Sequence, residues 1–141
     1  MVALASPPTT VASWQRRLYR DAQVDIWLVG WAPGQATELH DHGGSAGSFV
    51  VVTGSLTEAV LTPGDGLTDG LREHRRAAGD TVEFSERYIH RLRNGSDELT
   101  VSMHVYRRPL ARMNYYDLQA GILVRIASVA VDDPERMPCV R

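Results

Sequence analysis

Cysteine is almost absent from this chain, because its 141 residues include only one, Cys139, among the polar last few residues. A single thiol forms no disulfide within the chain, so a disulfide framework is excluded. No apolar run reaches the roughly 20 residues that a transmembrane helix needs. The opening Met1 to Ala5 is short and lacks the basic start of a secretory signal peptide. We therefore expect a cytoplasmic protein without a membrane partner.

An excess of charge of one sign is also missing. Fifteen Lys and Arg residues stand against 17 Asp and Glu residues, which leaves a formal net charge of -2. Proteins that bind nucleic acid or anionic membranes usually carry a basic surface, so the balance argues against both partners. The hydrophobic fraction of 43% is ordinary for a folded domain. We expect one domain over residues 1–141, with a loose lead-in at 1–13 and a tail at 133–141.

Long helical periods and internal repeats are missing as well. Short runs rich in strand-forming residues alternate instead with turns that contain Gly, Pro, Asn or Asp. The runs expected to form strands are residues 14–19, 24–31, 37–42, 48–53, 56–61, 80–84, 89–92, 99–106 and 122–131. Of these, 48–53 and 56–61 are expected to pair as a hairpin, while 71–78 fits either a short helix or an exposed strand. The pattern predicts an all-β barrel or sandwich.

Two histidines, His40 and His42, lie in one expected strand. Alternate side chains of a strand point to one face, so both imidazoles share a face while Asp41 points away. Neutral imidazole is a ligand for zinc, copper, nickel and iron. A third histidine, His90, opens a later strand. Together these three residues, called the histidine triad below, are the candidate metal ligands.

Glycine spacing around the histidine triad strengthens the metal prediction. The first block reads Gly34, five residues, His40-x-His42, four residues, Gly47, six residues and Gly54, and the second reads Gly79, ten residues, His90, three residues and Asn94. These blocks resemble the two cupin motifs at their usual spacing, with Gly47 replacing a glutamate and Ser85 and Arg87 replacing a proline and a glycine. The resemblance implies a cupin double-stranded β-helix, a small β-barrel of jelly-roll type.

A later strand carries a polar row formed by Ser102, His104 and Tyr106. These residues alternate with Met103 and Val105, so all three side chains fall on one face. An inward hydroxyl, imidazole and phenol are costly to bury unless each is hydrogen-bonded. A relay from Ser102 through His104 to Tyr106 would satisfy them. The alternative is a polar stripe that faces solvent.

The histidine triad and the polar row together resemble the cysteine dioxygenase family of thiol dioxygenases, which are iron-dependent cupins. The resemblance covers roughly Trp14 to Asp117. It implies that the triad holds Fe(II) and that the row orients the hydroxyl of Tyr106 beside the substrate and O2. In the family, an arginine on the strand leading into the barrel pairs with the substrate carboxylate. The matching position is Arg16, or Arg17 if the register differs by one residue.

Gly47 separates this chain from the animal members of the family, which have a cysteine there that cross-links to the tyrosine. Bacterial members often have glycine at this position. The resemblance therefore implies that Tyr106 carries no thioether cross-link, and we expect Gly47→Cys to place a thiol beside it.

The resemblance implies a reaction of a small thiol with O2 that yields a sulfinic acid. L-cysteine is the first choice of substrate, and 3-mercaptopropionate is the alternative. Two other classes stay open. A metal-dependent cupin isomerase or decarboxylase could add Glu38 to the triad, because alternation puts Glu38 on the same face. A non-catalytic, ligand-sensing cupin would keep the barrel without needing the polar row. Both a monomer and a homodimer are compatible with the sequence.

Overall fold

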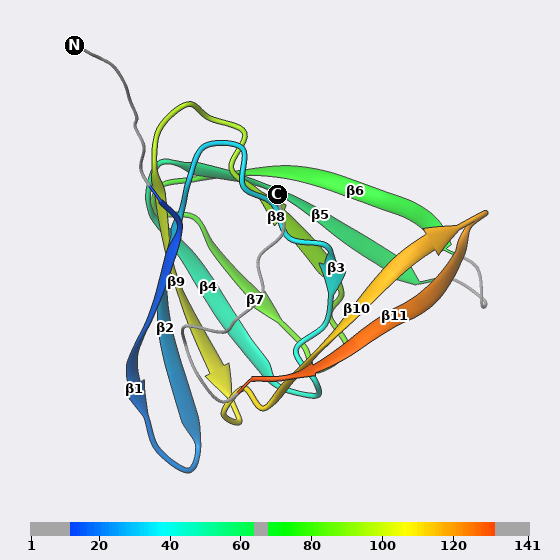
Figure 1. Ribbon diagram of the computed structural model, residues 1–141, viewed down its shortest axis with the longest axis horizontal. Helices are drawn as coiled ribbons and strands as arrows, with labels where there is room; N and C mark the ends of the chain where they lie inside the picture. Colours follow the sequence, from blue (N-terminus) through cyan, green and yellow to red (C-terminus); the bar gives the residue numbers. More distant parts are fainter. Residues whose placement is uncertain (1–11, 64–67, 132–141) are drawn as a thin grey trace.

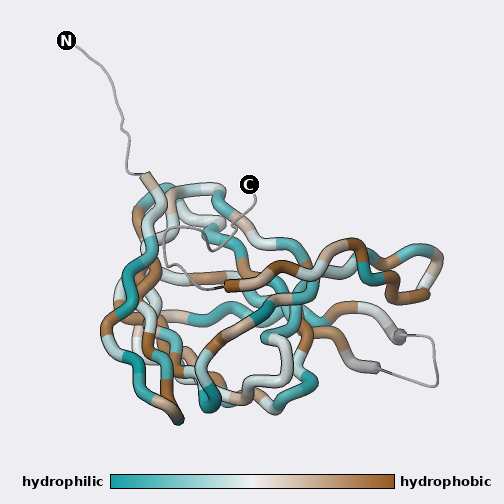
Figure 2. Tube along the Cα trace, turned by 60° about the horizontal axis from the view of Figure 1, so that its bottom comes forward, coloured by the Kyte–Doolittle hydropathy of each residue, from teal (hydrophilic) through white to brown (hydrophobic). Residues whose placement is uncertain are grey.

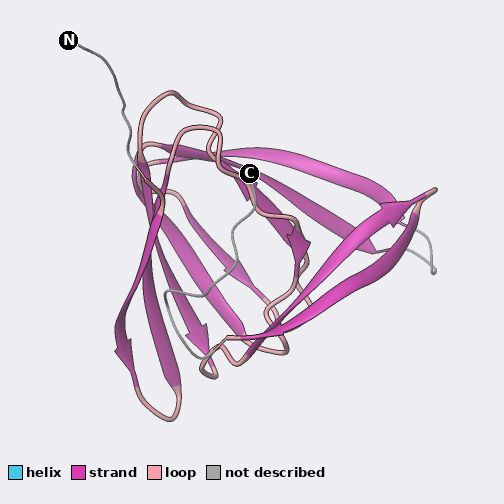
Figure 3. Cartoon of the chain, in the orientation of Figure 1, coloured by secondary structure: helices cyan, strands magenta, loops and turns pink. Residues whose placement is uncertain are grey.

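The computed structural model describes residues 12–63 and 68–131. Within these residues the chain forms eleven strands and no helix (Figure 3). This confirms the all-β prediction. Most of the expected lead-in and Cys139 lie outside the described residues. The described part of the chain contains no helix that could cross a membrane.

The strands form two antiparallel sheets that face each other across the core (Figure 1). The five-stranded sheet has the order β1 (Trp14–Arg20), β2 (Val24–Trp31), β9 (Thr100–Arg107), β4 (Ala46–Thr53) and β7 (Thr81–Phe84). The six-stranded sheet has the order β11 (Ile122–Ala130), β10 (Arg112–Gln119), β3 (Leu39–His40), β8 (His90–Arg93), β5 (Ser55–Pro63) and β6 (Thr68–Ala77).

Alternation along the strands builds the core between the sheets. In β2, β4 and β9 every second side chain is buried, which is the period expected of strands with one face turned inward. Hydrophobic and hydrophilic residues are mixed along the chain (Figure 2), and in β9 it is the polar residues that are buried. Trp27, Phe49 and Val51 of the five-stranded sheet pack in one cluster with Leu56 and Leu92 of the other. The site described below lies inside this core.

The expected hairpin between residues 48–53 and 56–61 is wrong. Strand β4 pairs with β7 and β9, whereas β5 pairs with β6 and β8, so the two runs belong to different sheets. Gly54 makes the crossing at φ +83°, where a Cβ would lie 2.3 Å from Thr100 Oγ1. The hydroxyl of Thr100 also donates to Ser55 O at 2.9 Å. Crossing between sheets lets Phe49 and Leu56 meet in one core from opposite sides.

Two further strands complete the six-stranded sheet. In the segment 71–78, which the sequence left open, residues 71–77 belong to β6 and pair with β5, so the helical alternative is wrong. Strand β10 was not expected, because its run of Arg, Asn, Tyr and Asp is polar. Its inner residues Met113 and Tyr115 are nonetheless buried. The hairpins β5–β6 and β10–β11 extend from the barrel on the same side (Figure 1).

Candidate metal centre

The histidine triad comes together on the inner face of the six-stranded sheet. His40 of β3 pairs directly with His90 of β8, and His42 follows two residues after His40. The ring centroid of His40 lies 5.1 Å from that of His42 and 4.8 Å from that of His90. The candidate ligand atoms of all three lie within 4.8 Å of one another. The side chains that the sequence selected therefore meet at one point.

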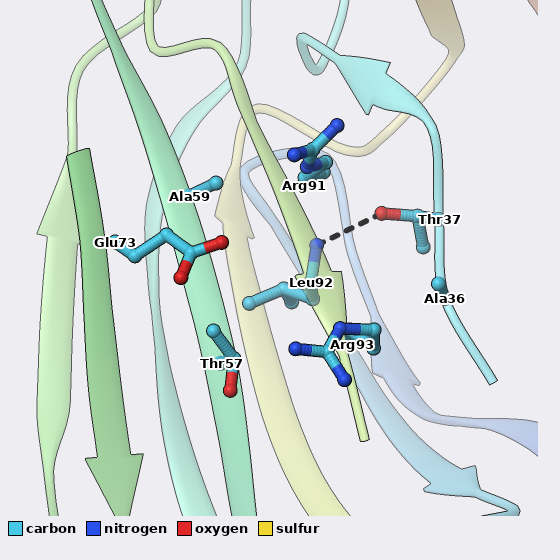
Figure 4. A pocket seen from close by; sticks show the side chains of 8 residues that line it. All are labelled: Ala36, Thr37, Thr57, Ala59, Glu73, Arg91, Leu92 and Arg93. Carbon is cyan, nitrogen blue, oxygen red and sulfur yellow. Dashed lines mark hydrogen bonds between the residues drawn. The ribbon is translucent and has the colours of Figure 1, made fainter. Parts of the chain in front are cut away.

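Local hydrogen bonds shorten the strand expected over residues 37–42 to Leu39–His40. Before it, Thr37 Oγ1 accepts from Leu92 N at 3.0 Å (Figure 4). Thr37 N also donates to Leu92 O at 2.9 Å. After it, Asp41 Oδ1 accepts from Gly43 N at 2.9 Å, while Gly43 turns the chain at φ +61°. The Asp41 carboxylate also accepts from the phenol of Tyr116 at 2.6 Å, so it points away from the triad as expected.

Hydrogen-bond partners fix which nitrogen of two histidines carries the proton. His40 Nδ1 lies 2.7 Å from Glu38 O, and His90 Nδ1 lies 2.7 Å from Glu58 Oε2. Carbonyl and carboxylate oxygens only accept, so both Nδ1 atoms donate and both Nε2 atoms keep a lone pair. Among the described residues, the buried His90 Nε2 and His42 Nδ1 have no hydrogen-bond partner. Buried nitrogens without a hydrogen-bond partner are rare, and binding to a metal ion would satisfy them.

Burial keeps the imidazoles of the triad neutral. Desolvation lowers the pKa of His40 to about 4, although the bond to the carbonyl of Glu38 opposes the shift. Desolvation also lowers the pKa of His42 and of His90 well below the usual value, and neighbouring histidines add to the effect. A metal ligand must be an unprotonated imidazole. At neutral pH the triad therefore presents lone pairs without charge, and these residues could hold a metal ion.

Glu58 is a residue of the site that the sequence did not reveal. It lies on β5, is fully buried, and bonds His90, Tyr88 and Arg76. The period of its strand predicts an inward side chain only after the strand's partners are known. Glu58 sits directly opposite Leu92 on β8, two positions from His90. A carboxylate in an apolar strand run is the one signal in the sequence that could have suggested it.

The polar row lies on the facing wall of the core. Ser102, His104 and Tyr106 are all buried on β9, while Met103 and Val105 of the same strand are only partly buried. The expected alternation is thus present, and the alternative of a solvent-facing stripe is wrong. Ser102 Oγ lies 2.7 Å from His104 Nε2, and the rings of His104 and Tyr106 stack with their centroids 6.3 Å apart.

Trp31 sets the direction in which hydrogen bonds are donated along the polar row. Its indole Nε1 donates to Ser102 Oγ at 2.8 Å, and an indole can only donate. The remaining contact of the Ser102 hydroxyl is to His104 Nε2, so the hydroxyl proton goes to that nitrogen. His104 is then the tautomer with its proton on Nδ1. Burial lowers the pKa of His104 to about 3, which keeps the ring neutral.

A small cavity separates the two walls. It has a volume of about 30 Å³, enough for one or two water-sized groups. Its lining contains the histidine triad, His104, Tyr106, Trp31, Thr37, Val29, Leu92 and Met113. The metal candidates and two members of the polar row therefore face one space. The rings of His42 and Tyr106 lie 5.3 Å apart across it.

Arg16 does not join this constellation. It pairs with Leu28 on β2, whereas Trp27 and Val29 carry the buried face, so Arg16 lies on the outer face and is exposed. Arg17 lies on the inner side, opposite Trp27. Its guanidinium bonds Asp25 at 2.9 Å and covers the Trp27 ring at 4.8 Å. Neither arginine lines the cavity.

Glu38 also stays away from the triad. Its side chain is exposed, and its contribution to the site is the backbone carbonyl that accepts from His40 Nδ1. Within the described residues, the metal-ligand cluster consists of the three histidines alone. The expectation that Glu38 shares the face of the histidines is wrong, because the short strand β3 begins only at Leu39.

Gly47 lies opposite Tyr106 in the pairing of β4 with β9, on the buried face of β4. A Cβ at this position would stand 2.0 Å from the carbonyl oxygen of Val105 and 3.0 Å from Phe84 Cζ. Any side chain there requires the backbone of β9 to move. The expected proximity to Tyr106 is correct, but a cysteine would not fit without this displacement.

The outer face of the six-stranded sheet carries a separate hollow of about 250 Å³, opposite in direction to the triad. Arg91 and Arg93 of β8, Glu73 of β6 and Thr57 of β5 line it (Figure 4). Arg91 stands next to His90 in the sequence, so the alternation of β8 sends the two side chains to opposite faces.

Comparison with solved structures identifies the architecture. A recombinant oxalate oxidase in complex with glycolate matches with a TM-score of 0.58 and 21% identity, over 68% of this chain and 51% of that chain. The Schizosaccharomyces pombe Cnp3 cupin domain matches with a TM-score of 0.58 and 10% identity, over 68% of this chain and 61% of that one. The protein TT1209 from Thermus thermophilus matches with a TM-score of 0.54 and 22% identity, over 69% and 84%.

These similarities show the cupin fold and no more, because all three identities are low. The chain spans 42% to 51% of the length of the oxalate oxidase chains that it matches. A family model described as cysteine dioxygenase type I matches residues 12–119, which include both walls of the cavity. With its cupin barrel and the histidine triad inside it, this chain belongs to the cysteine dioxygenase type I family.

Proposed function

We propose that the protein is an iron-dependent thiol dioxygenase whose substrate is L-cysteine. The reaction joins both atoms of O2 to the substrate sulfur, so that R–SH and O2 give R–SO2H. One observation carries the proposal. A triad of neutral histidines, with no carboxylate in the cluster among the described residues, shares a small cavity with His104 and Tyr106 of the polar row.

Bound at the triad, Fe(II) would supply the redox chemistry that couples O2 to sulfur. His40 and His90 would hold it through Nε2, because their Nδ1 atoms donate to oxygen acceptors. Three neutral imidazoles bring no negative charge to a divalent cation. Such a site favours an anionic partner, and a substrate thiolate provides one because its pKa falls beside a metal.

The polar row would position the reactants from the opposite wall. Its chain of hydrogen bonds runs from Trp31 through Ser102 to His104, which leaves the proton of His104 on Nδ1. The stacked rings of His104 and Tyr106 restrict each other. Tyr106 lines the cavity, and its phenol would help to hold a reacting group in place. Apolar Val29, Leu92 and Met113 complete the lining and limit the entry of water.

Recognition of the substrate carboxylate is still a prediction. The cavity lining includes no arginine among the described residues, and Arg16 lies on the outer face of its strand. The alternative substrate, 3-mercaptopropionate, has the same thiol and carboxylate but no amine, and the experiment below distinguishes the two. Location in the cytoplasm and a monomeric or homodimeric state likewise rest on the sequence alone.

The alternatives draw less support from the site. A cupin isomerase or decarboxylase that binds its metal through the carboxylate of Glu38 lacks that ligand here, because this side chain is exposed. A ligand-sensing cupin would not need the buried polar row. The row is what separates the thiol dioxygenase from both, because buried polar groups of this kind are costly to maintain.

Oxygen consumption by the iron-loaded protein tests the proposal. The purified chain is stripped of metal, reloaded anaerobically with Fe(II), and supplied with L-cysteine, 3-mercaptopropionate, cysteamine or oxalate. We expect O2 uptake with one of the two thiol carboxylates and a product heavier than the substrate by two oxygen atoms. Uptake of O2 with 3-mercaptopropionate alone would show that this thiol, and not L-cysteine, is the substrate. No uptake with any thiol, or turnover of oxalate, would overturn the proposal.

A further inference from the structure

Glu58 is a fully buried charged side chain next to the candidate metal centre, yet it is not a candidate ligand. Its two oxygens receive hydrogen bonds from three side chains. Oε1 accepts from Arg76 Nε at 2.8 Å, and Oε2 accepts from the Tyr88 hydroxyl and from His90 Nδ1, each at 2.7 Å. A carboxylate with this many donors has its charge well satisfied in a buried position.

Arg76 and Tyr88 hold the carboxylate of Glu58 in place. Arg76 is a permanent cation and makes a second contact to Oε1 through its terminal nitrogen at 2.8 Å. Burial and hydrogen bonding to Glu58 raise the pKa of Tyr88, so this phenol keeps its proton and donates it. The oxygen beside Nδ1 of His90 belongs to a carboxylate, which accepts hydrogen bonds. His90 therefore makes this bond by carrying its proton on Nδ1.

We infer that Glu58 is a positioning residue that holds His90 in the tautomer able to bind a metal. The contact places a hydrogen-bond acceptor on Nδ1 of His90 and leaves Nε2 for the metal. An acceptor on the far nitrogen raises the basicity of a ligating histidine and fixes its ring. This inference rests on the metal centre of the proposed function but not on its thiol chemistry.

Glu58→Gln breaks this arrangement while it preserves size. The amide has one oxygen and one NH2 group, so it cannot accept from both sides as the carboxylate does. With its oxygen toward Arg76, the NH2 group faces His90 Nδ1 and drives the ring proton to Nε2, where it blocks the metal position. With its oxygen toward His90, the NH2 group meets the N–H groups of Arg76. Either orientation weakens the metal site.

The first test uses the wild-type chain without metal. The ¹⁵N resonances of the histidine rings distinguish a protonated nitrogen from one with a free lone pair. We expect His90 to carry its proton on Nδ1 at pH 7.5. A proton on Nε2 of His90 in the wild-type protein would overturn the inference, and this result needs no variant.

The second test titrates Co(II) alone into metal-free wild type, Glu58→Gln and a control. Glu73→Gln is the matched control, because it removes the same charge from the neighbouring strand β6 at an exposed site away from the triad. Losing an outer partner of a ligating histidine typically costs about 10- to 100-fold in metal affinity. We expect a loss of this size in Glu58→Gln, with His90 losing its fixed Nδ1 proton, and wild-type affinity in Glu73→Gln.

Tyr88→Phe separates the role of His90 from the general stability of the cluster. It removes one donor to Oε2 but leaves the contact of Glu58 with His90, so the tautomer of His90 should not change. Unchanged Co(II) affinity and tautomer in folded Glu58→Gln would overturn the inference even if the enzyme oxidises thiols. Conversely, wild-type protein that shows the expected tautomer but oxidises no thiol would overturn the proposed function alone.

Discussion

The two walls of the cavity use the same residue type with opposite polarity. On the six-stranded sheet, His40 and His90 donate from Nδ1 to acceptors, which leaves lone pairs for a metal. On the five-stranded sheet, a chain that starts at the donor Trp31 ends on His104 Nε2, which leaves His104 with an N–H group. One wall therefore offers bases and the other offers a proton. The difference lies in the partner behind each ring and not in the imidazole itself.

Removing a ligand from the histidine triad should have the largest effect on activity and metal content. Replacing any member of the histidine triad with Ala leaves two ligands, so we expect metal content to fall sharply and activity to be abolished. Metal analysis after anaerobic loading with Fe(II) measures this. His74→Ala is the control, because His74 is exposed on β6. Metal content that survives all three single substitutions would show that the triad is not the metal site.

Breaking the opposite wall should lower turnover while the metal stays bound. Tyr106→Phe removes a hydroxyl but keeps the ring that stacks on His104. We expect turnover to fall roughly tens- to thousands-fold, as lost positioning or proton-transfer groups usually cost, with unchanged iron content. Steady-state kinetics and metal analysis on the same sample make the comparison. Full activity would remove the role given to the polar row.

Acid should destabilise the metal-free protein through His104. Its pKa is about 3 in the folded state against 6.5 for the free side chain, so the unfolded chain binds the extra proton. The contribution of His104 to stability is then fully present above about pH 6.5, and it is lost as the pH falls from there toward 3. From pH 6.5 to pH 5 the loss from this group is roughly 2 kcal/mol.

Urea unfolding of the metal-free wild type and of His104→Gln at pH 7.5, 6 and 5 measures this loss. The difference in stability between the two proteins should shrink as the pH falls, because glutamine does not titrate. A constant difference across this range would contradict the assignment of His104 as a buried neutral ring.

Adding a side chain at Gly47, within the five-stranded wall, should cost stability. A Cβ there meets the carbonyl of Val105, so Gly47→Ala and Gly47→Cys each require β9 to shift. Overpacking of this kind typically costs about 1–3 kcal/mol. Thermal unfolding measures this loss of stability, and unaltered stability in both variants would contradict the close approach.

The wild type has no sulfur at position 47, so it cannot form a thioether there to Tyr106. Its intact mass before and after turnover should therefore show no change from such a cross-link.

The smallest effect is expected at Arg16. The resemblance to the family assigned the carboxylate to this position, but the side chain lies on the outer face of β1. On the geometry alone, Arg16→Ala should leave turnover of L-cysteine relative to cysteamine close to that of the wild type. A large loss confined to thiol carboxylates would restore the prediction from the sequence. Arg17→Ala is a less clean comparison, because it also removes the partner of buried Asp25.

Much of the site could be predicted because strand period and motif spacing are local. Two residues of separation put Ser102, His104 and Tyr106 on one face whatever the strand pairs with. Strand β2 was predicted with its full bounds for the same reason. The orientation of Arg16 was harder to predict, because the face to which each side chain of β1 points depends on the register of β1 with β2. A turn and an irregularity after Arg17 set that register.

The sequence by itself determined the all-β class, the three histidines and the alternation that buries the polar row, because these follow from composition, spacing and a period of two. Only the tertiary structure decided that β4 and β5 lie in different sheets and that Glu58 stands behind His90. It also decided which nitrogen of each ring carries a proton. Such features depend on contacts between residues far apart in the chain, such as Glu58 with His90 and Trp31 with Ser102, and no local pattern encodes those pairings.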